Sequence, residues 1–285
     1  MGKKVVLSAD STCDLTPELF EKYNISRLPL YITFGEESFR DGIEITPDEL
    51  YQKVKETGVL PKTSAVSVGD FIEYFEKLLE DADQIIHFSL SSGLSCTYQN
   101  AVLAAADFNG RVFLVDTLNL STGEALTILH AAELLAAGHT AEEIVADCES
   151  YVKRVDASFI VDNLEFLRKG GRCSALAALG ANLLSIKPCI EVGGGKMDVG
   201  KKYRGKFKAV LQKYIEERLA SDDIDTSRIF VTHAGCADDV VEAAYQAVLD
   251  TGLFSEVLQT RAGCTISSHC GPDTLGILFV RNREI

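Results

Sequence analysis

The stretch 84–106, QIIHFSLSSGLSCTYQNAVLAAA, constrains the fold of this chain more than any other. Its first residues place Ile85, Ile86 and Phe88 around a histidine, which is typical of a short buried strand. A hydroxyl-rich turn from Ser89 to Ser95 follows, and an Ala-rich helical segment comes directly after it. A strand that leads through a polar turn into a helix is the repeating unit of parallel α/β sheets, so this stretch predicts such a sheet.

The same stretch has the chemistry of an anion site. The start of a helix leaves backbone N–H groups unpaired and carries partial positive charge. The turn contains no lysine or arginine, so it suits a singly charged carboxylate held by hydroxyls and amides better than a triphosphate. One alternative stays open: Ser91, Ser92 or Ser95 could simply cap the helix.

The first half of the chain repeats the alternation of strand and helix. Helix starts are predicted at four capping sequences: Thr16-Pro17, Thr46-Pro47, Ser67 with Asp70, and Thr140 with Glu143. Apolar runs predict strands at 5–7, at 111–115, and at 25–34 as one continuous strand. This alternation favours a three-layer α/β/α domain in which helices cover both faces of a mainly parallel sheet.

The pattern changes near residue 156. A strand at 158–161 and a small-residue helix at 174–185 precede a predicted hairpin, in which three glycines join 189–192 to 196–199. A hairpin implies antiparallel pairing, so we expect a two-layer α/β domain with a mixed sheet and helices mainly on one face. At 285 residues the chain exceeds the usual size of a single core, and we place two domains at 1–156 and 157–285.

Three loops are expected to meet at the N-terminal sheet. Asp10–Thr12 and Ser89–Ser95 both follow predicted strands, and Thr63-Ser64 precedes a predicted helix. Ligands of open α/β sheets bind at the carboxyl ends of the strands, where these loops would lie.

Charge and cysteine usage narrow the functional classes. The net charge of −14 argues against binding to nucleic acid or to an anionic membrane surface, since both need a cationic protein face. The first residues hold too few apolar side chains for a signal peptide or a membrane span. Eight cysteines without a C-x-x-C pair indicate reduced thiols. These features predict a cytoplasmic protein with no integral membrane segment.

One segment departs from the acidic average. The segment 168–213 contains 11 Lys and Arg residues and two acidic residues, so it carries +9 and the rest of the chain carries −23. Such a basic segment is either a solvated face or a docking surface for a phosphate group or an acidic partner.

Familiar catalytic sequences are missing: the chain has no G-x-S-x-G, G-x-x-x-x-G-K-[ST], H-E-x-x-H or G-x-G-x-x-G. His269 stands in a polar run, residues 264–272, that we interpret as extended backbone. Neighbouring side chains on an extended chain point to opposite faces, so we do not expect His269 and Cys270 to share a metal ion. His269 could face a ligand, or it could be a satisfied core histidine.

Five short motifs, ordered along nearly the whole chain, resemble the DegV family of bacterial fatty-acid-binding proteins, the FakB type. They are Asp10-Ser11-Thr12 with Asp14-Leu15-Thr16-Pro17, Pro61-Lys62-Thr63-Ser64 with Ser67, Leu94-Ser95-Cys96-Thr97-Tyr98-Gln99, Leu167 to Arg172, and His269-Cys270-Gly271-Pro272. The resemblance implies a DegV-like pair of α/β domains around a long-chain fatty acid such as palmitate. The N-terminal domain would supply the carboxylate-binding loops, and the C-terminal domain would enclose the acyl chain.

The resemblance also implies the site residues and the partner. The ligand-binding residues would be Thr63, Ser64, Ser95, Thr97, Arg172 and His269, with Thr63 and Ser95 on the carboxylate and Arg172 and His269 nearby. Proteins of this type present the fatty acid to a separate fatty acid kinase catalytic subunit, which phosphorylates the carboxylate to an acyl phosphate for phospholipid synthesis. The chain would then be a carrier subunit with no catalytic residue, metal or cofactor of its own.

Two positions depart from the family pattern. Cys96 and Asp273 stand where the family usually has glycine. Cys96 could alter the turn beside the carboxylate, and Asp273 could add negative charge near His269.

The chemistry of the residues agrees with the resemblance. A buried carboxylate needs several charge-assisted hydrogen bonds, which hydroxyls and helix-start amides supply. Each buried methylene contributes about 0.8 kcal/mol, so an acyl chain of about 16 carbons gains roughly 12 kcal/mol in a long apolar tunnel. The candidate wall residues are Ala175, Leu176, Ala178, Leu179, Leu183 and Leu184.

Two other functions remain as alternatives. The first is a self-sufficient small-molecule hydrolase or transferase that uses Ser95. The second is an interaction protein with a vestigial pocket, whose basic segment 168–213 binds a partner.

Overall fold

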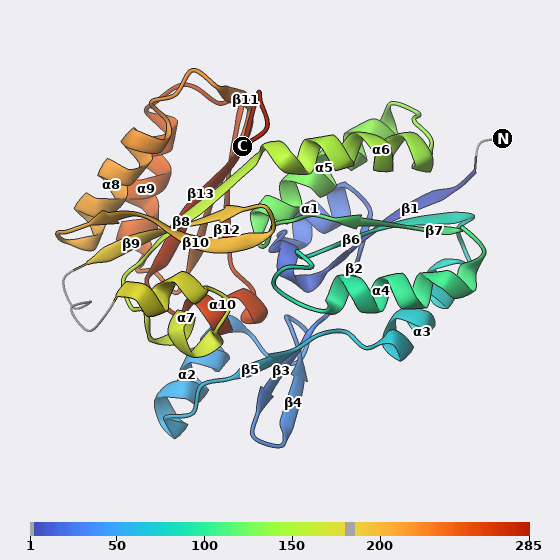
Figure 1. Ribbon diagram of the computed structural model, residues 1–285, viewed down its shortest axis with the longest axis horizontal. Coiled ribbons are helices and arrows are strands. Elements are labelled where there is room, and N and C mark those ends of the chain that lie inside the picture. The colour runs from blue at the N-terminus through green and yellow to red at the C-terminus, as the bar shows by residue number, and fades with distance from the viewer. Residues whose placement is uncertain (1–2, 180–185) are drawn as a thin grey trace.

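A computed structural model describes residues 3–179 and 186–285 of the chain. The protein is a mixed α/β structure with two main sheets, and helix α5 (Thr122–Ala136) lies between them (Figure 1). A third, smaller sheet projects at the bottom of the view, beside the contact between the two halves (Figure 1).

The N-terminal sheet is entirely parallel. Its strands are β1 (Val5–Asp10), β2 (Ile25–Leu28), β6 (Gln84–Ser89) and β7 (Val112–Asp116), in the order β2-β1-β6-β7. Helices α3 (Val68–Leu78) and α4 (Thr97–Ala105) pack on one face, and α1 (Pro17–Lys22), α5 and α6 (Ala141–Tyr151) pack on the other. Ile85 belongs to the first cluster and its neighbour Ile86 to the second, because side chains alternate along a strand. The predicted three-layer α/β/α domain is confirmed.

The helix starts predicted from capping sequences are also confirmed. Thr46, Ser67 and Thr140 each form a capping box with the acidic residue three positions later. Thr16 accepts the Leu19 N–H and precedes Pro17 at the first helical position.

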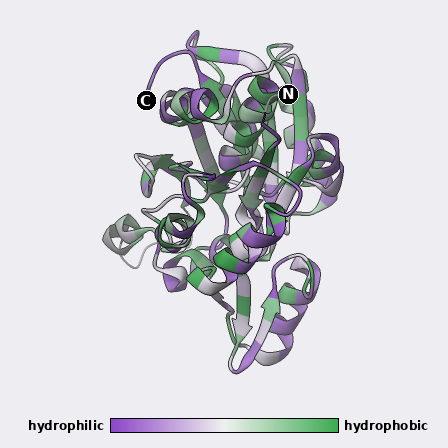
Figure 2. Cartoon of the chain, turned by 90° about the vertical axis from the view of Figure 1, so that its right-hand side faces the viewer, coloured by the Kyte–Doolittle hydropathy of each residue, from purple (hydrophilic) through white to green (hydrophobic). Residues whose placement is uncertain are grey.

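The prediction of one strand at 25–34 is wrong. The chain leaves the parallel sheet after Leu28, and β3 (Tyr31–Phe34) belongs to the small antiparallel sheet β4-β3-β5. Pro29 lies between the two strands and has no N–H to donate to a continuing ladder. The other strands of the small sheet are β4 (Glu37–Arg40) and β5 (Lys62–Ser64), and α2 (Pro47–Thr57) lies between them in sequence. This part of the chain projects at the bottom of Figure 2.

The C-terminal sheet is mixed, as predicted. Its strands are β8 (Val155–Val161), β9 (Lys187–Gly193), β10 (Lys196–Tyr203), β11 (Ile224–Ala234), β12 (Glu256–Arg261) and β13 (Thr274–Arg281), in the order β10-β9-β8-β13-β11-β12. The predicted glycine hairpin is the antiparallel pair β9–β10, and β11–β12 is parallel. Helices α8 (Phe207–Arg218) and α9 (Asp238–Leu249) cover one face, while the other face turns toward α5 (Figure 1).

The remaining elements are short. They are α7 (Glu165–Gly170), α10 (Cys264–Cys270) and the 3-10 helices η1 (Ser11–Cys13), η2 (Ala106–Phe108), η3 (Val152–Arg154) and η4 (Ser174–Leu179). The small-residue helix predicted at 174–185 is a 3-10 helix over 174–179, and residues 180–185 lie outside the described residues. The extended conformation expected for 264–270 is wrong, because this segment is α10.

Two observations bear on membranes and redox chemistry. None of the helices within residues 3–179 and 186–285 is long and apolar enough to cross a membrane. The eight cysteines are free thiols, and seven of them are buried.

Candidate ligand-binding site

A cavity lies where the small sheet, the turn after β6, helix α10 and strand β10 come together. Its polar lining consists of Thr63, Ser95, Arg172, Thr265 and His269. Its apolar lining consists of Leu30, Ala65, Leu90, Leu94, Leu120, Met197, Ile266 and Cys270. The structure therefore brings together four of the six predicted site residues, although they are spread over more than 200 positions of sequence.

Thr63 and His269 contact each other directly. The Thr63 Oγ1 lies 2.8 Å from the His269 Nε2, and the two residues belong to β5 and α10. Burial lowers the pKa of His269 to about 4, and the positive charge of Arg172 adds to the effect. The imidazole is therefore neutral at pH 7 and carries a single ring N–H.

The other ring nitrogen of His269 faces the chain of α7. Nδ1 is buried and has no hydrogen-bond partner among the described residues. A Cβ at Gly170 would lie 2.6 Å from this nitrogen, so a side chain there would displace the imidazole. The glycine pair in the motif 167–172 is thus explained in part by the space that His269 needs.

Ser95 has both roles considered from the sequence: it helps to start a helix, and it lines the ligand cavity. Its Oγ accepts the Thr97 N–H at 3.2 Å and lies 2.9 Å from the Thr97 Oγ1, so it helps to start α4. It also lines the cavity. Thr97 is fully buried and contacts Ser95 rather than the cavity, so it orients the Ser95 hydroxyl. Ser91 and Ser92 do not cap α4, because the Ser91 hydroxyl donates to the Gly195 carbonyl and the Ser92 N–H donates to Asp116.

Arg172 and Ser64 lie at the edge of the site. Arg172 lines the cavity while its exposed side chain donates from Nη1 to the Gly170 carbonyl at 2.8 Å. Ser64 is exposed on β5 and is absent from the cavity lining. Side chains alternate along a strand, so the orientation that turns Thr63 inward turns Ser64 away.

Among the described residues no acidic side chain lines this cavity, although the chain as a whole is strongly acidic. The groups that converge there are three hydroxyls, an imidazole and a guanidinium, and the Thr265 hydroxyl already donates to Asp41. Hydroxyls and charged donors of this kind hold a carboxylate in several hydrogen bonds, so the electrostatics of the cavity favour a small anionic group.

Two further hollows adjoin the cavity. Leu120, Ile266 and Cys270 line both the cavity and an inner, apolar cavity beside Phe159 and Leu278. These two cavities are narrow, with volumes of about 50 and 30 Å³.

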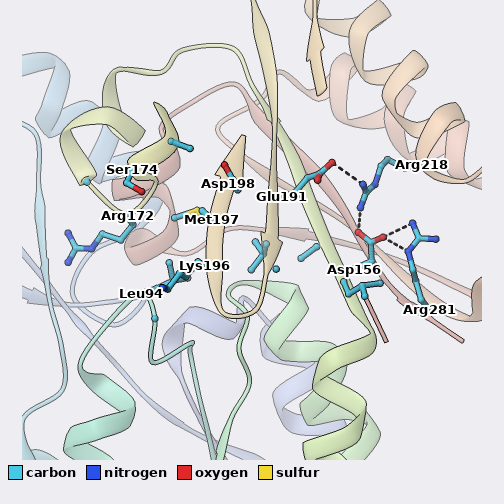
Figure 3. A pocket seen from close by; sticks show the side chains of 17 residues that line it. Leu94, Asp156, Arg172, Ser174, Glu191, Lys196, Met197, Asp198, Arg218 and Arg281 are labelled. Atoms are coloured by element: carbon cyan, nitrogen blue, oxygen red, sulfur yellow. Dashed lines mark hydrogen bonds and ion pairs between the residues drawn. The ribbon is translucent and has the colours of Figure 1, made fainter. Parts of the chain in front are cut away.

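The second hollow is an open groove over strands β8, β9 and β10 (Figure 3). The groove shares Leu94, Arg172 and Met197 with the cavity and has a volume of about 1060 Å³. Binding sites for small molecules usually measure about 300–1,000 Å³, so only the groove has room for a long ligand without movement of its walls.

The groove has an apolar floor, and charged side chains, among them Glu191, Lys196 and Asp198, also line it. Val192 and Ala157 line it next to Met197, and the register pairs Met197 with Val192 and Val192 with Ala157. At the far end, Asp156 pairs with Arg218 and Arg281 (Figure 3).

Only part of the predicted tunnel wall can be located. Ala175 lines the groove and Leu176 is buried in the core. Ala178, Leu179, Leu183 and Leu184 lie outside the described side chains.

The basic segment is divided between two places. Arg172 and Lys196 line the groove near the cavity. Lys201, Lys202, Arg204 and Lys213 surround a separate hollow formed by β10 and α8. Six positions of extended chain separate Lys196 from Lys202, about 20 Å, so the lysines at 201 and 202 lie away from the cavity.

The two departures from the family pattern have different consequences. Cys96 is exposed with φ −82°, a conformation that needs no glycine, so the turn beside Ser95 accommodates it. Asp273 has φ +55°, in the left-handed region, and its side chain is exposed. The groups that shift the pKa of His269 are its own burial and Arg172, and Asp273 is not among them.

Sequence reasoning missed several residues of the site. Leu30, Leu94, Met197 and Thr265 line the cavity but carry no local pattern that separates them from core or surface residues. No cluster of three His, Cys, Asp or Glu side chains suited to a metal ion occurs in the described part of the chain.

The comparison with known proteins identifies the family. A family model described as "Uncharacterised protein, DegV family" matches residues 4–282. The chain belongs to the DegV family. The resemblance inferred from the five motifs is therefore confirmed at the level of the family.

Relatives of the chain include named fatty-acid-binding proteins. A DegV domain-containing protein of Deinococcus radiodurans is 34% identical over 275 residues, 96% of this chain and 97% of that protein. A protein of Thermotoga maritima named "Fatty acid-binding protein" is 35% identical and covers 96% of each chain. The crystal structure of a DegV family protein from Thermus thermophilus, described as fatty acid binding, has a TM-score of 0.90 at 34% identity, with 98% of this chain and 99% of that chain covered. Fatty-acid binding is thus a property of DegV family proteins closely similar to this chain.

Proposed function

We propose that this protein binds a long-chain fatty acid, with the carboxylate among Thr63, Ser95, Arg172 and His269 and the acyl chain along the apolar floor of the groove. One observation carries the proposal: donor-bearing side chains from four separate segments converge on a cavity whose described lining holds no acidic side chain, and which shares the apolar residues Leu94 and Met197 with the groove. The similarity to named fatty-acid-binding relatives supports it.

Each residue has a distinct role in this proposal. The Thr63 and Ser95 hydroxyls donate to the carboxylate oxygens, and neutral His269 fixes the orientation of Thr63 through their 2.8 Å contact. Thr97 holds the Ser95 hydroxyl in place, and Arg172 supplies positive charge at the mouth. Ser64 lies outside the cavity and makes no direct contact with the ligand.

The carrier presents the carboxylate of the bound fatty acid to a partner. Arg172 is exposed and joins the cavity to the open groove, so the carboxylate end lies near the protein surface. A fatty acid kinase catalytic subunit would phosphorylate the carboxylate there. The nearby cations Arg172 and Lys196 would then hydrogen-bond to the phosphate group of the acyl phosphate. The protein would act in the cytoplasm as a carrier, with palmitate as a representative ligand and the domains divided near residue 156.

The alternative of a hydrolase or transferase with Ser95 as nucleophile has less support. Such a serine needs a general base within hydrogen-bond reach. Within the described residues the Ser95 hydroxyl bonds only to Thr97, and the imidazole of His269 bonds to Thr63.

Two measurements test the proposal. Native mass spectrometry and lipid extraction of the purified protein should reveal a fatty acid in near-stoichiometric amount, and the delipidated protein should bind palmitate in a calorimeter. No extracted lipid together with no heat of palmitate binding would overturn the binding proposal. Acyl phosphate should form only when a fatty acid kinase subunit and ATP are added, and formation by this chain alone would overturn the carrier role.

A further inference from the structure

Helix α10 carries His269 near one end, and two buried carboxylates hold its other end. Asp41 accepts the Cys264 N–H at 2.8 Å through Oδ1 and the Thr265 N–H at 3.1 Å through Oδ2. The Thr265 hydroxyl donates to the same Oδ2 at 2.6 Å, and Asp14 accepts the Gly263 N–H at 2.8 Å. A helix of seven residues is too short to be stable by itself, so these contacts determine where α10 lies.

Asp41 belongs to the part of the molecule that also carries Thr63. It directly follows β4, its N–H donates to the Leu30 carbonyl at 2.9 Å, and the residue is 1% exposed. Thr63 lies in the same small sheet, on β5, opposite Ile32 of β3. Helix α10 is therefore attached to the small sheet twice, at its start through Asp41 and near its end through the contact between Thr63 and His269.

The carboxylate of Asp41 is itself fixed by a fourth donor. The Ser11 hydroxyl donates to Oδ2 at 3.0 Å and accepts the Leu30 N–H at 3.0 Å. No Lys or Arg forms an ion pair with Asp41 in the part of the chain that the structure describes. Its charge is balanced by amides and hydroxyls in fixed directions, so a change of this one side chain affects the position of α10 directly.

We propose that Asp41 is a positioning residue of the ligand site, which holds the start of α10 against the small sheet and so sets His269 against Thr63. The effect on ligand affinity rests on the proposed fatty-acid binding. The effect on the contact between Thr63 and His269 does not depend on it.

A double-mutant cycle separates positioning from a general loss of stability. Asp41→Asn keeps the volume of the side chain but turns an NH₂ group toward the donors of α10. We expect it to raise the dissociation constant of palmitate about tenfold, and to have little further effect when His269→Gln is already present. An equal factor in both backgrounds would show that Asp41 does not act through His269 and would overturn the proposal.

A matched control removes a helix cap elsewhere. Thr140 caps α6 by accepting the Glu143 N–H at 3.3 Å, on a helix outside the ligand site. Thr140→Ala should lower stability as the loss of a cap does, without changing the dissociation constant of palmitate. A tenfold change in this control would mean that any loss of stability weakens binding, which would overturn the positioning role.

A second readout follows the imidazole in the ligand-free protein. The NMR signals of the His269 ring should move in Asp41→Asn and in Thr63→Val, and should stay in place in Thr140→Ala. Ser11→Ala gives the same test with a milder change, should Asp41→Asn fail to fold. If the unmodified protein binds no palmitate, the proposed function fails, and the ring signals alone decide the role of Asp41: unchanged signals in both Asp41→Asn and Ser11→Ala would overturn it.

Discussion

Two regions of the molecule are surrounded by the same kinds of group: the buried carboxylates of Asp41 and Asp10, and the mouth of the ligand cavity. Asp41 receives two helix-start amides and two hydroxyls, and Asp10 receives two amides and two hydroxyls. The mouth offers the Thr63 and Ser95 hydroxyls, an imidazole and a guanidinium, and none of the described side chains that line it is acidic.

The difference between these regions lies in where the anion comes from. In the first region the carboxylates belong to the chain, and their donors are part of the fixed core. At the mouth, the donors converge without a carboxylate of the chain, and they are mostly half-buried. The same arrangement of hydrogen-bond donors therefore stabilises the fold where the chain supplies the carboxylate, and binds a ligand where the ligand supplies it.

The largest expected effect is on stability, from the loss of a buried acid. Asp10→Ala would leave the amides of Thr12 and Leu90 and the Ser89 hydroxyl without their acceptor. We expect the free energy of unfolding to fall by about 3 kcal/mol, because each stranded buried donor costs about 1–3 kcal/mol. Urea unfolding measures the change, with the exposed Asp107→Ala as a control expected to change stability by less than about 0.5 kcal/mol.

Changes at the mouth should lower the affinity for palmitate more than they lower stability. Thr63→Val and Ser95→Ala remove one hydroxyl each and should weaken palmitate binding by about 1–3 kcal/mol, because the buried carboxylate loses a donor. Calorimetry measures this loss, and urea unfolding of the ligand-free variants should show a smaller loss of stability than Asp10→Ala, because each variant removes one local contact, with the Thr97 N–H or with His269. If Thr63→Val or Ser95→Ala lost stability but kept its affinity for palmitate, the hydroxyl would stabilise the fold and not the ligand, and the two regions would not differ.

The two regions should also respond to pH with opposite signs. Glu124 of α5 accepts the Thr12 hydroxyl at 2.9 Å, next to Asp10. Burial raises the pKa of Glu124 well above 4.5, so the folded state keeps a proton that the unfolded chain releases, and stability falls as pH rises above 4.5. Burial lowers the pKa of His269 from 6.5 to about 4, so stability is lost as pH falls from 6.5 toward 4. Each group contributes a slope of about 1.4 kcal/mol per pH unit within its own window.

Two glutamine variants assign these slopes. Glu124→Gln should flatten the loss of stability above pH 4.5, and His269→Gln should flatten the loss between pH 6.5 and 4, in urea unfolding of ligand-free protein at a series of pH values. If Glu124→Gln left the loss of stability above pH 4.5 unchanged, the Glu124 carboxyl would not be holding a proton in the folded state.

The smallest effect on ligand occupancy is expected from the distant cations. Replacement of Lys201, Lys202 and Arg204 by Ala should leave palmitate binding unchanged, because these residues surround a hollow away from the cavity. If a kinase subunit docks on this face, its association rate should fall and lose its dependence on salt, as is usual for charges at the rim of an interface. Loss of palmitate from this triple variant would show that the division between holding and presenting the ligand is wrong.

The sequence predicted the parts of the fold that depend on neighbouring residues. The capping boxes at Thr46, Ser67 and Thr140 are local, and so are the glycine hairpin and the buried strand that contains Ile85 and Ile86. Helix α10 could not be predicted in this way. Its run of Ser, Thr, Cys and His has no helical period of apolar residues, and its start is held by Asp14 and Asp41, more than 220 positions earlier.

The candidate site shows the same limit. Thr63, Ser95, Arg172 and His269 were selected by resemblance to a family, and the structure brings all four to one cavity. The roles of Asp41 and Gly170 depend on contacts between distant segments, which no local pattern reveals. The opposite orientations of Thr63 and Ser64, by contrast, follow from the alternation of side chains along a strand, which is a local property of the sequence.

The central claim is that the mouth holds a fatty carboxylate in its ionised form, and NMR of palmitate with an isotope-labelled carboxyl carbon tests it most directly. The account predicts that the bound signal stays at the position of the ionised acid from about pH 8 to about pH 5, because hydrogen bonds and positive charge favour that form. In the double variant with Thr63→Val and Ser95→Ala, the bound signal should move toward the protonated acid or disappear. A wild-type signal that already titrates within this range, as burial without donors would cause, would contradict the account.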